Sequence, residues 1–197
     1  MSKLLGYNRI EDVMSPRLNE YDDSEPDSIY SHSKKLIGNS IRDLYPVLIK
    51  KGEDGNGLNQ MNKGLLGNLV ELYHFGKIPD RSQSPDFPNA GENGCELKCT
   101  GLDNNQMPKE LLRITRINIK EVTKFETFIN KLRLVVLILY KYADDTKWQD
   151  MNFVKSILID LESDVPELII KEIEEEFYRI IKLMKDGDFT DIRKKTD

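Results

Sequence analysis

The chain has no apolar run long enough to cross a membrane. The longest, Leu134 to Tyr140, falls far short of the roughly 20 residues that a membrane-spanning helix needs. The first residues, MSKLLGYNRIEDVMSPRL, also lack the apolar stretch that a secretory signal requires. We therefore expect a soluble, cytoplasmic protein without a membrane partner, and we interpret the apolar run as a buried strand.

Cysteine and histidine are both scarce. The two cysteines, Cys95 and Cys99, lie in GCELKCTG, a strand-like segment. Residues four apart in a strand are separated by roughly 13 Å, beyond the separation of about 7 Å between Cα atoms that a disulfide tolerates. We expect both thiols to pack in the core, where free cysteine is common. The histidines, His32 and His74, have no metal-ligand spacing, and we predict structural or surface roles for them.

A surplus of positive charge is missing as well. The 29 Lys and Arg residues face 34 Asp and Glu residues, which gives a formal net charge of −5 at pH 7. This balance gives no general sign of binding to nucleic acid. A content of 39% hydrophobic and 32% charged residues is ordinary for a globular protein, and 197 residues suffice for one domain with a core. Composition alone leaves the function open.

The beginning of the chain differs from the remainder. Residues 1–28 carry Ser, Pro, Asp and Glu in clusters with few apolar positions, and we expect an extended or partly disordered lead-in there. Residues 29–197 contain the periodic apolar positions of a folded domain, and no internal repeat divides them. We therefore expect one domain over residues 29–197.

Periodicity and turn residues predict the order of the elements. Helices are predicted over 29–50, from Asn62 to Gly76, over 121–130 and over 165–185, the last capped by Asp164 with Pro166 in its first turn. Strands are predicted over 95–101, 111–118, 132–142 and 156–161. Strands interleaved with helices predict an α/β or α+β fold built on a sheet.

Glu96 and Lys98 lie on one face of the first predicted strand. Residues two apart in a strand project to the same side, so Glu96, Lys98 and Thr100 share a face. The opposite face is apolar and belongs in the core. The polar pair is compatible with two arrangements: a local ion pair, or a metal ligand beside an amine that activates water or stabilises charge.

Asp86 precedes this strand in a Pro-flanked loop, SPDFPN. A loop of this length can fold back and place the Asp86 carboxylate beside Glu96. Two converging carboxylates repel each other unless a cation lies between them, and hard oxygen ligands with open water positions suit Mg²⁺. Such a metal supports attack on a phosphorus, and Lys98 would donate a hydrogen bond to the nucleophile or the phosphate. Surface ion pairs remain the alternative, because this short motif also arises by chance.

Three segments resemble the MutH-like restriction endonuclease family of the PD-(D/E)xK superfamily. NKGLLGNLVELY is similar to the family's helix with an Asn/Asp-Lys-Gly start and a Gly-x-x-x-Glu step. DFPNAGENGCELK resembles the family's Asp-Phe…Gly-Val-Glu-Leu-Lys segment, with a longer insertion before the glutamate. FINKLRLVVLILY resembles a later segment in which a lysine precedes a strand. The segments occur in family order, and the resemblance covers roughly residues 29–187.

The resemblance implies a fold and a catalytic centre. The fold would be restriction-endonuclease-like, with a central mixed β-sheet flanked by helices. Asp86 and Glu96 would bind Mg²⁺, for which Mn²⁺ can substitute, and Lys98 would orient or activate the attacking water. Glu71 would join the acidic site from its helix, and Lys131 would approach the scissile phosphate.

The same resemblance implies a contact with DNA at Lys63 and Gly64. A glycine permits close approach of the backbone, and a lysine can contact phosphate or base edges. The chain departs from the family at its end, DGDFTDIRKKTD, where MutH-like enzymes continue with a segment that reads the major groove. We therefore expect a fragment of a longer protein, in which an additional C-terminal domain or dimerisation on DNA supplies the reading of the sequence.

The function implied is that of a Mg²⁺-dependent type II restriction endonuclease that cuts double-stranded DNA at GATC. Two alternatives stay open: a non-catalytic DNA-binding or allosteric effector domain with a nuclease-like fold, and a MutH-type nicking enzyme of mismatch repair. A plain protein-interaction scaffold would explain the apolar periodicity, but not the pairing of acidic and basic residues.

Overall fold

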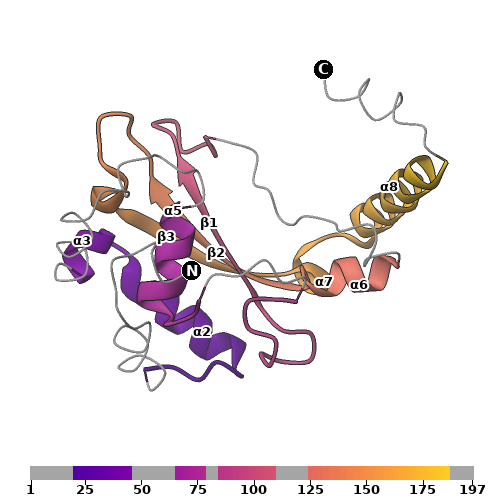
Figure 1. The fold of residues 1–197 in the computed structure, drawn as a ribbon, viewed down its shortest axis with the longest axis horizontal. Coiled ribbons are helices and arrows are strands. Elements are labelled where there is room, and N and C mark those ends of the chain that lie inside the picture. Colours follow the sequence, from indigo (N-terminus) through magenta and orange to yellow (C-terminus); the bar gives the residue numbers. More distant parts are fainter. Residues whose placement is uncertain (1–19, 46–64, 79–83, 110–123, 187–197) are drawn as a thin grey trace.

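The computed structural model describes residues 20–45, 65–78, 84–109 and 124–186 (Figure 1). Within these residues the centre is a three-stranded mixed sheet in the order β1–β2–β3. The strands are β1 (Glu96–Leu102), β2 (Leu134–Lys141) and β3 (Phe153–Asp160). β1 and β2 run parallel, whereas β3 is antiparallel to β2. Three predicted strands are thereby confirmed; the fourth, over 111–118, lies outside the described residues.

The apolar run of β2 is explained by its central position. β2 is hydrogen-bonded to β1 on one edge and to β3 on the other. Val136 and Ile138 are fully buried, and Val136 is opposite Leu97 of β1 in the parallel register. A strand with partners on both edges and a helix-covered face needs few polar side chains, so the interpretation as a buried strand is confirmed.

Short helices cover the face of the sheet that carries Leu97. They are α2 (Pro26–Ser33), the 3₁₀ turn η1 (Lys34–Leu36), α3 (Ile41–Leu44), α5 (Leu65–Leu69) and the π-helical turn η2 (Val70–His74). α5 packs closely on β1, since the Gly67 backbone lies next to Cys99. The apolar side of the predicted second helix is confirmed by the buried residues Leu66, Leu69, Val70 and Tyr73. Its predicted start, Asn62, lies outside the described residues.

The predicted single helix over 29–50 is wrong. α2 begins at Pro26 and η1 ends at Leu36, after which the chain leaves the helix through Gly38 at φ 86°. The Gly38 N–H donates to the Phe153 carbonyl, and the Phe153 N–H donates to the Asn39 carbonyl, both at 2.9 Å. The segment therefore pairs with β3 instead of continuing the helix. The spacing of apolar residues cannot reveal that this backbone pairs with Phe153, because Phe153 lies far away in the sequence.

A new helix starts at once, because Ser40 and Asp43 form a reciprocal cap. The Asp43 N–H donates to Ser40 Oγ at 3.2 Å, and the Ser40 N–H donates to Asp43 Oδ2 at 2.8 Å. This capping box begins α3, in which Ile41 is fully buried. Ser40 and Asp43 are a local sequence pattern for the start of a helix. The helical spacing of apolar residues continues through this pattern, which is why one longer helix was predicted.

The two histidines lie in the core and stack on each other. His32 of α2 and His74 of η2 are each 2% exposed, and their ring centroids are 4.2 Å apart. Tyr21 stacks on the other side of His32, and the Tyr45 hydroxyl lies 2.7 Å from His74 Nδ1. Of the structural or surface roles predicted for the histidines, the structural one is confirmed for both.

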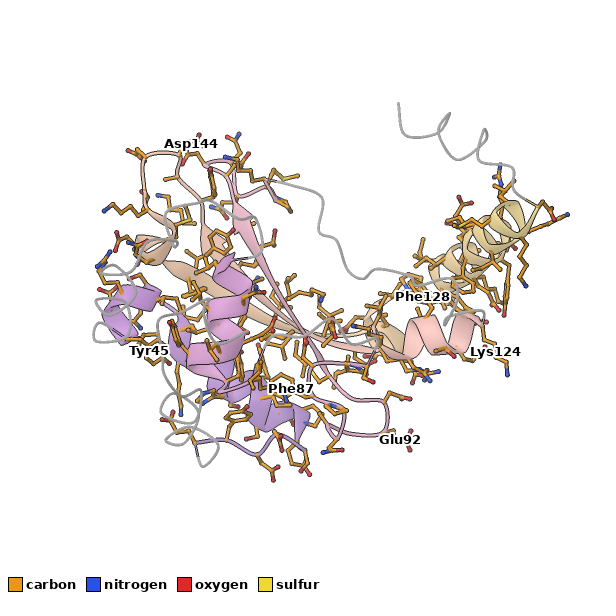
Figure 2. All side chains as sticks on the ribbon, viewed as in Figure 1. Tyr45, Phe87, Glu92, Lys124, Phe128 and Asp144 are labelled. Carbon is orange, nitrogen blue, oxygen red and sulfur yellow. The ribbon has the colours of Figure 1, made fainter. Side chains whose placement is uncertain are left out.

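A second apolar cluster forms at the other end of the molecule. α6 (Phe125–Asn130) packs on α8 (Glu167–Lys185) through Phe125, Ile129, Phe177 and Ile181. Figure 1 shows α6, α7 (Leu161–Asp164) and α8 beyond the end of the sheet, away from α2, α3 and α5. In Figure 2, Lys124 lies at the α6 end of the molecule, and Asp144 lies at the opposite end of the sheet, between β2 and β3.

The predicted cap of the last helix is wrong. Pro166, and not Asp164, immediately precedes α8. The Asp164 carboxylate instead accepts the Asp160 N–H at 2.8 Å and closes the short helix α7. Asp164 does accept a backbone N–H with its side chain, as a capping residue would, but it does so within α7 and not at the start of α8.

The described residues form an α+β domain with a mixed sheet and flanking helices, so the predicted fold class is confirmed. Cys95 and Cys99 are both free thiols, as predicted. Among the residues that the structure describes, none of the helices has the length and apolar character needed to cross a membrane.

Candidate functional site

Glu96 is the most deeply buried charged residue of the sheet among those described. It begins β1 and is 1% exposed. Its neighbour Leu97 turns to the helix-covered core, so the alternation of the strand sends Glu96 to the opposite face. Burying a carboxylate costs free energy unless charged or hydrogen-bonding groups surround it, so Glu96 needs such partners.

Two lysines reach the same oxygen of Glu96. Lys98 Nζ forms an ion pair with Glu96 Oε1, which is one of the two arrangements that their shared strand face allowed. Lys131 Nζ lies 3.7 Å from that oxygen. Lys131 directly follows α6 and precedes β2. Because β1 and β2 are parallel, the entry to β2 lies at the same end of the sheet as the start of β1, which brings Lys131 to Glu96.

Asp86 approaches Glu96 from the loop before β1. Its backbone N–H donates to Glu96 Oε2 at 3.3 Å, and its Oδ2 accepts the Leu97 N–H at 2.8 Å. An antiparallel bridge between Phe87 and Cys95 holds the two segments together. The predicted folding back of this loop is therefore confirmed.

The electrostatics of Glu96 follow from these neighbours. Burial raises the pKa of Glu96 above its ordinary value, and the negative charge of Asp86 raises it further. The ammonium groups of Lys98 and Lys131 act in the opposite direction. Two carboxylates and two ammonium groups thus form a compact site in which the charges formally balance.

The donor set fits a hard divalent cation with few protein ligands. In the part of the chain that the structure describes, no three side chains of His, Cys, Asp or Glu are grouped so that they could hold a metal. Mg²⁺ does not need such a group, because it commonly binds through one or two carboxylates and completes its shell with water and substrate phosphate. Asp86 and Glu96 supply two carboxylates, and the buried position of Glu96 would strengthen its attraction for a cation.

Glu71 was predicted to join the acidic site, and that role stays a prediction. Glu71 belongs to η2, and its charge raises the pKa of the Cys99 thiol, after the larger effect of burial. The charges that act on the Glu96 carboxylate are those of Asp86, Lys98 and Lys131. Since Cys99 alternates with Lys98 along β1, Glu71 acts from the helix-covered side of the strand. The predicted DNA contacts, Lys63 and Gly64, lie outside the described residues.

Gly94, for which no role was predicted from the sequence, allows the loop after Asp86 to return to β1. Gly94 has φ 80°, and a β-carbon there would come within 2.9 Å of the Phe87 carbonyl oxygen. The signal was present in GENGCELK, where a glycine immediately precedes the strand. A glycine at such a point commonly indicates a left-handed turn or a close approach of two backbone segments.

Comparison with known families agrees with this geometry. The family model described as DNA mismatch repair enzyme MutH matches residues 75–172, about half of the chain. The matched segment contains Asp86, Glu96, Lys98 and Lys131 and all of β1, β2 and β3. No curated protein was found to match the chain. Through residues 75–172, with its mixed sheet and flanking helices, the protein belongs to the MutH-like family of DNA endonucleases.

Proposed function

We propose that this protein is a divalent-metal-dependent endonuclease that hydrolyses a phosphodiester bond in double-stranded DNA. The observation that supports this best is the meeting of Asp86, Glu96, Lys98 and Lys131 at the start of β1, within the segment that matches the family model. Two carboxylates can hold a cation, and two ammonium groups can bind and stabilise a phosphate under attack.

Asp86 and Glu96 are the proposed ligands of Mg²⁺, with Mn²⁺ as a substitute. When bound, the metal would supply positive charge that makes a water molecule more acidic and stabilises charge at the phosphorus. Glu96 would exchange its ion pairs with lysine for this cation. Lys98 would then be released to donate a hydrogen bond to the attacking water or to the phosphate.

Lys131 is proposed to bind the scissile phosphate. It approaches Glu96 from the connection between α6 and β2, and so from a different element than Lys98. Two ammonium groups that arrive from different elements can contact different oxygens of one phosphate. The proposal that both lysines act on one phosphate is supported by the position of both ammonium groups beside Glu96 Oε1.

Three further roles are proposed from the resemblance of the sequence segments. Glu71 would join the acidic site through water or a second metal. Lys63 and Gly64 would contact DNA just before α5. A cytoplasmic location is proposed as well, as expected from the sequence.

The recognition of GATC and type II double-strand cleavage are also proposals. One metal site cuts one strand, so cleavage of both strands would require a second copy of the site, which dimerisation on DNA would supply. A single copy that cuts once would instead act as a MutH-type nicking enzyme. Cutting a supercoiled plasmid that contains GATC distinguishes the two, because nicking produces open circles and double-strand cleavage produces linear DNA.

The experiment that tests the site compares matched variants of the whole chain. Asp86→Asn and Glu96→Gln should lose Mn²⁺ binding in calorimetry and cleavage of a GATC duplex. Lys98→Ala should keep Mn²⁺ binding and lose cleavage by about 100-fold or more, as expected for a group that acts in the chemical step. Asp144→Asn and Lys109→Ala remove an exposed ion pair elsewhere in the protein and should change neither property. Normal cleavage by both Glu96→Gln and Lys98→Ala would refute the assignment.

The alternative is a non-catalytic DNA-binding or allosteric effector domain. One observation favours it: Glu96 already has two lysine partners that neutralise it without a metal. This alternative predicts that the chain binds duplex DNA while Mn²⁺ produces no stoichiometric binding heat. Metal binding that disappears in Glu96→Gln would exclude it.

A further inference from the structure

The Asp86 loop is joined to β1 by a two-residue backbone bridge. The Phe87 N–H donates to the Cys95 carbonyl and the Cys95 N–H donates to the Phe87 carbonyl, both at 2.9 Å. Asp86 and Glu96 flank this bridge directly. In an antiparallel pair, residues that face each other across the ladder project to the same side. The register of the bridge therefore decides that the two carboxylates meet.

Gly94 lies where this bridge is most crowded. An added β-carbon would lie 2.9 Å from the Phe87 carbonyl oxygen and 2.9 Å from Pro85 Cγ. The Phe87 oxygen is the acceptor of the bridge itself, so a side chain at position 94 would push directly against the hydrogen bond from Cys95. The backbone of Gly94 also has φ 80°, which L residues with a side chain rarely adopt.

Gly91 in the same loop offers a contrast. It has φ 62°, so it makes a similar demand on the backbone. A β-carbon at Gly91 would meet only Pro26 Cγ at 3.5 Å, which is an ordinary contact. Gly91 is exposed, and Figure 2 shows its neighbour Glu92 at the outer end of the loop. A substitution at either glycine strains a left-handed backbone, but only a substitution at Gly94 also collides with the bridge. Comparing the two therefore distinguishes the effect of the collision from the effect of the strain.

We propose that Gly94 is a positioning residue: by admitting the Phe87–Cys95 bridge, it holds Asp86 against Glu96 and so sets the affinity of this pair for a divalent cation. The part that concerns the cation rests on the proposed function. The positioning itself is a property of the backbone, and it is measurable without metal. The proposal concerns position 94, where a side chain would collide with the bridge.

The first measurement follows the Leu97 amide, whose N–H donates to Asp86 Oδ2 at 2.8 Å. In Gly94→Ala, this amide should exchange faster with solvent hydrogen and shift in the NMR spectrum, because Asp86 moves away. Gly91→Ala should leave it unchanged. Gly94→Asn provides a second variant, since asparagine tolerates a positive φ but retains the colliding β-carbon. It should behave like Gly94→Ala in this respect, even if Gly94→Ala folds poorly.

The second measurement is calorimetric titration of the whole chain with MnCl₂. Gly94→Ala and Gly94→Asn should bind Mn²⁺ about 10-fold to 100-fold more weakly, the loss usual when a group that orients a metal ligand is removed. Gly91→Ala should bind as the unaltered chain does. An unchanged Leu97 amide in folded Gly94 variants would overturn the inference. If the amide responds as expected but the unaltered chain binds no Mn²⁺, the positioning stands and the proposed metal function fails.

Discussion

His32 and His74 each donate their Nε2 proton to the backbone carbonyl of the other residue, at 2.9 Å in both directions. A carbonyl oxygen only accepts, so Nε2 must carry the proton in both rings. The pair joins α2 to η2, the turn that carries Glu71. It therefore anchors the helical layer over β1 through two reciprocal contacts that neither helix could make alone.

Removal of either histidine should destabilise the domain. We expect His32→Ala and His74→Ala each to lower the free energy of unfolding by about 2–4 kcal/mol, because each leaves a buried carbonyl without its donor and opens a cavity. The double variant should cost less than the sum, since both changes remove the same stacking between the two rings. Urea unfolding of the four proteins measures this cycle. Additive losses would show that the two rings act independently.

The reactivity of Cys99 should report the position of Glu71. The Glu71 charge raises the pKa of the Cys99 thiol, in addition to the larger effect of burial. Glu71→Gln should therefore lower that pKa, increase the thiolate fraction at a given pH and move the alkylation rate profile to lower pH. Cys95→Ala serves as the background, so that one thiol is observed. An unchanged profile would place the Glu71 carboxylate away from Cys99.

Cys95 should be inert in the folded protein. Burial raises the pKa of its thiol to about 12, with smaller contributions from Asp86 and Glu96. At pH 8 almost no thiolate is present, so a Cys99→Ser variant should react with a disulfide reagent only when it unfolds. The measurement compares the reaction rate with and without urea. Rapid reaction of the folded variant would contradict the burial of Cys95.

Acid should weaken α3 through its cap. Hydrogen bonds from the Ser40 side chain and backbone hold the pKa of Asp43 below its ordinary value of 3.8. A carboxyl whose pKa is lower in the folded state contributes stability above its unfolded pKa, and this contribution is lost as the pH falls below about 4. Asp43→Asn should therefore make unfolding less dependent on pH in this acidic range. Ser40→Ala should do the same, and a wild-type acid profile in both variants would refute the cap.

The cluster between α6 and α8 should be separable from the main core. Phe177 is 3% exposed and stacks on Phe128 at 5.3 Å between ring centroids. Phe177→Ala should cost about 3–5 kcal/mol of local stability and increase hydrogen exchange in α6 and α8 more than in β1–β3. Since Lys131 follows α6, its contact with Glu96 should weaken as well. Leu168→Ala on the same helix is the control, because Leu168 is 66% exposed and should change stability by less than about 0.5 kcal/mol.

The sequence by itself determined which side chains could share a face. Strand alternation placed Glu96 and Lys98 together, and the apolar run from Leu134 predicted a central strand, because both depend only on local backbone geometry. The spacing of Cys95 and Cys99 likewise excluded a disulfide between them. These predictions needed no knowledge of distant partners.

Tertiary structure decided what depends on contacts between distant segments. Lys131 reaches Glu96 because β1 and β2 run parallel, and Asp86 reaches it because Phe87 pairs with Cys95 across Gly94. The predicted helix over 29–50 failed for the same reason, since Phe153 competes for the backbone at Gly38. A periodic pattern describes one element at a time, whereas hydrogen bonds between elements depend on how the chain returns to itself. The carboxylate–lysine site is of that second kind.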